Sequence, residues 1–124
     1  MTNWTADELD RIGRSDELQV SSQRADGSLR PYVTIWVVRS GEDLYVRSAY
    51  GPDNGWFRRA KASDKGRIRA GGVERDVAFE ATEPSVDADL HGAYHAKYDR
   101  YGPSMVGTVV SPEAARATLR LVPR

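Results

Sequence analysis

Apolar and polar residues follow two different periods along the chain. A period of two, or a run rich in β-branched and aromatic residues, is typical of strands. The strongest such run is Tyr32–Val38, and because both of its faces carry apolar residues we expect it to be covered on both sides. On this basis we predict six strands: Leu18–Gln23, Tyr32–Val38, Asp43–Ser48, Gly66–Ala70, Val73–Ala81 and Thr118–Val122.

Turn signals join neighbouring strands into hairpins. Asp26-Gly27, Ser40-Gly41-Glu42 and Gly71-Gly72 each separate two predicted strands, and glycine supplies the positive φ values that tight turns require. Consecutive hairpins without an intervening helix predict an antiparallel sheet that curls into a small barrel. Pro123 predicts a strand end or an edge position for the last strand.

The first two predicted helices are short. Thr5 and Glu8 have the spacing of a capping box, and Gly13 is a candidate for the helix end. A second helix, Trp56–Ala62, is basic and aromatic and follows a turn rich in glycine.

The third predicted helix, Val86–Tyr101, is longer. Its apolar residues recur every three to four positions on one face: Val86, Leu90, Tyr94, Tyr98 and Tyr101. Met105–Val110 is apolar, but its pattern leaves strand and helix open. Ser111-Pro112-Glu113 is typical of a helix start.

Composition narrows the class of protein. The chain has 124 residues, 40% hydrophobic and 29% charged, so we expect a single domain over residues 1–124. The 18 basic and 18 acidic residues balance, which argues against nucleic acid or an anionic membrane as a partner. Without cysteine, disulfides and thiol chemistry are excluded. No secretory signal and no membrane-spanning run is present, so we predict a cytoplasmic protein.

The segment Arg47–Arg59 joins a strand end, a glycine-rich turn and a helix start. Such a turn brings backbone N–H groups close to an anion, and its arginines add charge. If the strands pair as predicted, Arg30 lies beside Arg47. We therefore predict a cationic pocket mouth for a phosphate or carboxylate. The alternative is a set of solvated arginines paired with Glu42, Asp43 and Asp53.

Aromatic residues near this segment could line a pocket for a planar ring. The candidates are Tyr32, Trp36, Tyr45, Tyr50 and Trp56. For Trp36 we favour packing between the sheet and the helices. Tyr50 and Trp56 lie beside glycines on a loop, so packing and ligand contact both stay open for them.

Both histidines belong to one helical stripe. Asp87, His91, His95 and Asp99 follow one another at a spacing of four. Two histidines at this spacing can share a metal, but no glutamate follows His91 as in the zincin helix. We favour a solvent-facing stripe with Asp–His pairs and predict no metal site. No serine has the context of a nucleophile, so catalytic residues stay unassigned.

Several stretches resemble the domain of unknown function 2255 family. They are Tyr-Val-Thr-Ile-Trp-Val-Val at 32–38, Asp-Leu-Tyr-Val-Arg-Ser-Ala-Tyr-Gly at 43–51, Gly-Trp-Phe-Arg-Arg-Ala at 55–60, Ala-Tyr-His-Ala-Lys-Tyr at 93–98 and the ending 118–124. This pattern is in turn similar to the split β-barrel superfamily that binds flavin mononucleotide (FMN) or deazaflavin. The resemblance implies a mainly β (α+β) fold: a small antiparallel split β-barrel of about six strands with two or three peripheral helices.

The same resemblance implies a flavin- or deazaflavin-binding oxidoreductase that forms a homodimer, with a small-molecule ligand near the contact. The expected cofactor-binding residues are Arg30, Thr34, Arg47, Ser48, Tyr50, Gly51, Trp56 and Arg58. The deazaflavin branch has a Gly-Arg-Lys-Ser-Gly segment before its first long strand, whereas this chain has Arg24–Arg30 without the lysine. The alternative is therefore a non-redox protein that binds an anionic metabolite and has lost the cofactor.

Overall fold

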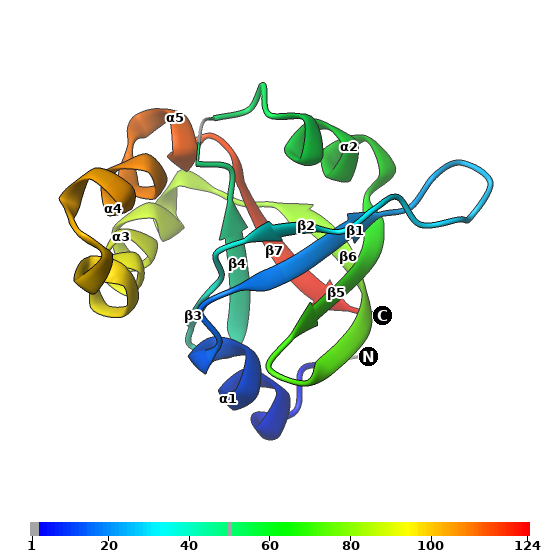
Figure 1. Ribbon diagram of the computed structural model, residues 1–124, viewed down its shortest axis with the longest axis horizontal. Helices are drawn as coiled ribbons and strands as arrows, with labels where there is room; N and C mark the ends of the chain where they lie inside the picture. Colours follow the sequence, from blue (N-terminus) through cyan, green and yellow to red (C-terminus); the bar gives the residue numbers. More distant parts are fainter. Residues whose placement is uncertain (1–2, 50) are drawn as a thin grey trace.

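A computed structural model describes residues 3–49 and 51–124 (Figure 1). Within these residues, seven strands form one antiparallel sheet in the order β2-β1-β5-β6-β7-β4-β3. Their bounds are β1 Leu18–Ser22, β2 Val33–Ile35, β3 Val38–Ser40, β4 Asp43–Arg47, β5 Lys65–Ala70, β6 Val73–Ala81 and β7 Thr118–Pro123. The two outer strands, β2 and β3, are separated in the chain only by Trp36 and Val37. The sheet therefore curls until its edges approach each other, which confirms the mainly β split-barrel fold.

The prediction of Tyr32–Val38 as one continuous strand is wrong. β2 pairs with β1, whereas β3 pairs with β4. Between them, the backbone of Val37 bonds to helix α3 (Asp87–Tyr98): its N–H donates to the Tyr98 hydroxyl at 3.1 Å, and its carbonyl accepts from Lys97 Nζ at 2.7 Å. Side chains of a distant helix thus satisfy backbone groups that a strand ladder would otherwise use. This break accounts for seven strands in place of six.

In the described part of the chain, five helices surround the sheet, more than the two or three expected. They are α1 Ala6–Arg14, α2 Gly55–Ser63, α3 Asp87–Tyr98, α4 Pro103–Val110 and α5 Pro112–Ala115, with 3-10 turns at Pro84–Val86 and Asp99–Tyr101. The capping box is confirmed, since Thr5 Oγ1 accepts from the Glu8 N–H at 3.1 Å and Glu8 accepts from the Thr5 N–H at 2.9 Å. The predicted end of this helix at Gly13 is wrong, because α1 continues to Arg14.

The apolar segment whose state the sequence left open is helix α4, and β7 lies inside the sheet. β7 pairs with β6 on one side and β4 on the other, so the proline at position 123 marks a strand end and not an edge. No helix in the described part of the chain is long and apolar enough to cross a membrane.

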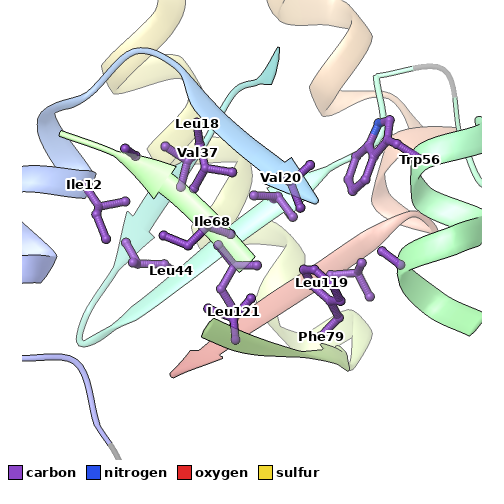
Figure 2. Close-up of a cluster of buried hydrophobic side chains, with 14 of the residues drawn as sticks. Ile12, Leu18, Val20, Val37, Leu44, Trp56, Ile68, Phe79, Leu119 and Leu121 are labelled. Atoms are coloured by element: carbon purple, nitrogen blue, oxygen red, sulfur yellow. The ribbon is translucent and has the colours of Figure 1, made fainter. Parts of the chain in front are cut away.

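Two apolar clusters cover the two faces of the sheet. Inside the barrel, Leu18, Ile68 and Leu121 pack together, and Trp56 lies at one end of this cluster (Figure 2). Outside, α3 and α4 pack against β3 and β4, with Tyr94 and Tyr98 fully buried. The expectation that residues 32–38 are covered on both sides is confirmed at the break: Val37 belongs to the inner cluster, Val38 to the outer one.

Candidate functional site

An apolar pocket of about 300 Å³ lies between β2, the end of β4, the start of α2 and helix α4. This volume is at the lower end of the range for small-molecule sites, about 300–1,000 Å³. Each element contributes part of the wall. The lining includes Thr34, Trp36, Arg47, Asn54, Trp56 and Met105.

Two tryptophans form fixed aromatic walls of this pocket. The ring of Trp36 stacks on Tyr98 with centroids 4.0 Å apart and planes within 3°. Trp56 is buried and meets Phe57 edge to face at 5.9 Å. The expected packing role of Trp36 is confirmed, and this residue lines the pocket as well. Because packing holds both indoles, the pocket is largely preformed.

Arg47 lines the pocket, but its guanidinium is engaged inside the protein. Nε donates to Thr118 Oγ1 at 2.9 Å, Nη1 to the Val109 carbonyl at 2.9 Å, and Nη2 to Asp87 Oδ1 at 3.1 Å. Burial lowers the pKa of Arg47, while Tyr94 and Asp87 favour its charged form. All three nitrogens therefore have partners within the fold, and Arg47 shapes the wall instead of presenting a free cation.

Arg30 and Arg58 lie outside this pocket, in a basic trough of about 1060 Å³ between the β1–β2 loop and α2. The expectation that Arg30 lies beside Arg47 is wrong. Arg30 precedes β2, which pairs with β1, whereas Arg47 ends β4, which pairs with β3 and β7. The trough and the pocket adjoin at the start of α2, where Gly55 lines the first and its neighbours Asn54 and Trp56 line the second.

The remaining predicted residues are distributed over the loop after β4 and over β2. Thr34 is exposed and lines the pocket. Ser48 is buried, its N–H donates to the Ala117 carbonyl at 3.0 Å, and its Oγ has no partner in the described part of the chain. Gly51 has a φ of 91° and packs against Glu113. Tyr50 lies outside the described residues.

Sequence reasoning missed the contribution of α4. Met105, Thr108 and Val109 line the pocket, and Met105 is 53% exposed. Their segment could not be assigned as helix or strand, so no face of it could be placed. The sequence signal that could have pointed to this wall is a methionine in an apolar, uncharged segment, Met105–Val110.

Among residues 3–49 and 51–124, which include the histidine stripe, no group of three or more His, Asp or Glu side chains could hold a metal ion. The favoured Asp–His pairing is confirmed for His95, whose Nδ1 lies 2.8 Å from Asp99 Oδ1. Asp87 instead pairs with Arg47. Burial, and then the charge of Arg47, lower the pKa of His91.

Fold and site together define a small split barrel with an aromatic-walled pocket and an adjoining basic trough. The model of a family described as an uncharacterized protein conserved in bacteria (DUF2255) matches residues 8–121, so the chain belongs to that family. This confirms the resemblance seen in the sequence. No curated protein matches the chain.

Solved structures share the fold at low sequence identity. An F420 reductase is 16% identical over 94% of this chain and 90% of its own, with a TM-score of 0.56. The heme storage protein HutZ from Vibrio cholerae is 12% identical over 99% and 92%, with a TM-score of 0.60. A FAD-binding protein from Mesorhizobium loti is 15% identical over 99% and 92%, with a TM-score of 0.53. At these identities the likeness concerns the fold alone.

Proposed function

We propose that the protein binds a flavin or deazaflavin cofactor, with the ring system in the apolar pocket, and that it acts as an oxidoreductase. The observation that carries this proposal is the pair of fixed indole walls, Trp36 and Trp56. A planar ring gains dispersion and quadrupole interactions against such walls. Similar folds named as an F420 reductase and a FAD-binding protein support this choice of ligand.

The polar groups of the pocket are few, as ring-binding sites require. Thr34 is exposed on the pocket wall, and Asn54 precedes α2 without using its side chain as a helix cap. These two side chains can hydrogen-bond to polar edges of a ring system. Arg30 and Arg58, in the adjoining trough, can hold a phosphate. The bound cofactor would supply the hydride chemistry, while these residues bind and orient it.

The donor set fits a flavin better than a heme. An iron porphyrin takes an axial ligand from His, Cys, Met or Tyr. Among the described residues that line the pocket or the trough, the one such side chain is Met105, which is 53% exposed. The described lining of the pocket therefore offers aromatic side chains to a ring but no imidazole to a metal.

A second candidate is the binding of an anionic metabolite without redox chemistry. The trough favours it, because its volume of about 1060 Å³ exceeds the pocket's 300 Å³ and its cations need no ring to attract an anion. In that case the pocket would hold only an apolar substituent of the ligand.

We further propose that the protein works as a homodimer. Within residues 3–49 and 51–124, the exposed large apolar residues are Tyr101 and Met105, at 45% and 53%. Both belong to the uncharged segment 101–112, and Met105 also lines the pocket. A second copy seated on this segment would cover the pocket mouth and exclude water from the ring.

Tryptophan fluorescence tests the cofactor proposal. Titration with FMN, FAD and a deazaflavin is expected to quench emission, because the ring would lie against two of the three tryptophans. Trp36→Phe and Trp56→Phe should each reduce the quenching.

The matched control is Trp4→Phe. Trp4 is buried just before α1, and its Nε1 donates to the Leu121 carbonyl at 3.0 Å. Helix α1 lies at the end of the barrel away from α2 (Figure 1). This variant should keep the quenching. Emission that no flavin or deazaflavin changes would overturn the proposal, and a thermal shift with phosphates alone would favour the second candidate.

A further inference from the structure

A second cavity borders the side chains that hold Arg47 in place. Its volume is about 430 Å³, and α2, the end of β6 with the segment after it, the start of α3, helix α5 and β7 bound it. Arg47 lines the aromatic pocket, whereas its partners Thr118 and Asp87 line this cavity. The two spaces are therefore distinct, with a buried guanidinium bonded to side chains of both walls.

Charged side chains of both signs line the second cavity. The cations are Lys61 in the last turn of α2 and Arg116 at the end of α5, and the carboxylates are Glu83 and Asp87. Asp87 pairs with Arg47, but in the described part of the chain neither cation forms an ion pair, and Glu83 forms none either. Opposite charges that line one cavity without pairing across it leave space for a ligand that carries both charges.

The floor between these charges is apolar. Phe57 and Leu119 line the cavity and are 3% and 2% exposed. Further apolar surface comes from Pro84, Pro112 and Ala115. Apolar surface beneath separated charges favours a ligand whose two charged ends flank a compact apolar body, since polar groups fix orientation while apolar burial supplies much of the affinity.

We propose that this cavity binds a small zwitterion with an apolar side chain, an amino acid or a dipeptide. The carboxylate of the ligand contacts Lys61 and Arg116, and its ammonium contacts Glu83. Asp87 adds negative charge on the side of Glu83 and keeps its bond to Arg47. No described residue lines both this cavity and the aromatic pocket or the basic trough, so the inference does not depend on the proposed cofactor.

Isothermal titration with L-leucine and with leucyl-leucine, at about pH 6 where the α-amine stays charged, tests the inference. The tighter of the two probes shows whether the site takes a free amino acid or a dipeptide. N-acetylation of that probe removes the cation, and amidation removes the anion. Each change should weaken binding by about fivefold, because a contact between exposed charges contributes up to ~1 kcal/mol.

Two variants assign the two ends of the ligand. Arg116→Gln and Glu83→Gln should each weaken binding of the unmodified probe by about fivefold. Amidation of the probe should then cost less in Arg116→Gln than in the parent protein, and N-acetylation should cost less in Glu83→Gln, because each variant has already lost the contact concerned.

The matched controls are Arg39→Gln and Glu17→Gln. Arg39 is exposed on β3 and packs against Gly13 of α1, and Glu17 is exposed just before β1. Neither residue lines the cavity, so both variants should bind the probe as the parent protein does.

Three outcomes would overturn the inference. The first is the absence of binding by both leucine and leucyl-leucine. The second is equal affinity for the zwitterion and for either singly charged derivative, because one charge would then suffice. The third is an equal loss in Glu83→Gln and Glu17→Gln, which would place the ligand elsewhere. None of these outcomes bears on quenching by flavins, so the cofactor proposal and this inference can fail separately.

Discussion

At the scale of single residues, the surroundings of Arg47 decide its role. Its guanidinium joins β7 through Thr118, α4 through Val109 and α3 through Asp87. Its side chain is 0% exposed. A buried charge of this kind is tolerated because every donor has a partner, and removing it leaves those partners unsatisfied. Arg47 therefore holds the helices against the sheet beside the pocket.

Replacing Arg47 by Met should lower the free energy of unfolding by about 3 kcal/mol, since the Val109 carbonyl and the Asp87 carboxylate lose their donor. Urea denaturation measures this loss. Arg39→Met, at an exposed arginine, is the control and should change stability by less than about 0.5 kcal/mol. A loss in Arg47→Met no larger than in the control would contradict the structural role.

Lys97 makes stability depend on pH. Burial lowers its pKa from 10.5 to about 8, and its Nζ donates to the Val37 carbonyl. Between these pH values the unfolded chain keeps the proton and the native chain releases it, so the free energy of unfolding rises as pH rises from 8 towards 10.5. Solvent screening at this partly exposed side chain limits the rise to the order of 1 kcal/mol.

Lys97→Met should remove this rise. Thermal unfolding of both proteins across this pH interval measures the difference, and the tyrosines, which both share, contribute equally to each curve. Parallel curves for the variant and the parent protein would show that Lys97 titrates in the native state as it does in the unfolded chain.

At the scale of elements, close backbone approach fixes how β1 and β5 pair. Gly66 lies opposite Ser22, and a Cβ on it would lie 1.9 Å from the Ser21 carbonyl oxygen. By contrast, Gly92 in α3 has nothing within 4 Å of such a Cβ. The same substitution should therefore have opposite effects at these two glycines.

Gly66→Ala should lower the free energy of unfolding by about 3 kcal/mol or prevent folding, because the clash is with backbone and cannot relax by a rotamer change. Gly92→Ala should raise it by about 0.5–1 kcal/mol, because alanine loses less entropy than glycine in a helix. Chemical denaturation of the pair measures both. Equal effects would contradict the close approach of β1 and β5.

Much of the element order could be predicted, because turns and caps depend on neighbours in sequence. Gly71-Gly72 joins β5 to β6 as expected, with both residues at positive φ. The break at Trp36 and Val37 could not be predicted from local pattern. It depends on Lys97 and Tyr98, about sixty positions later in the chain.

At the scale of the whole molecule, the uncharged segment 101–112 is where the proposed homodimer would form. Met105→Asp places a charge in that contact. It should give a monomer by sedimentation and weaken cofactor quenching, because an isolated charge is costly to bury. Ser85→Asp adds the same charge at an exposed position outside the segment and should change neither property. A wild-type protein that sediments as a monomer would contradict the dimer.

The sequence by itself determined the features that arise from short-range chemistry. Strand periods, glycine turns, the Thr5–Glu8 cap and the tyrosine face of α3 all depend on residues within a few positions of one another. Family membership followed from the same local stretches. Of the residues predicted for the site, Thr34, Arg47 and Trp56 line one pocket.

Only the tertiary structure decided how these pieces share space. The strand order places Arg30 and Arg47 on strands that do not pair. Arg47 is buried and bonded within the fold, so it has a structural role. Helix α4 contributes Met105 to the pocket. Strand pairing and burial are set by contacts between distant parts of the chain, which no local pattern encodes. The barrel therefore carries two adjoining surfaces, an aromatic pocket and a basic trough, where the sequence predicted one.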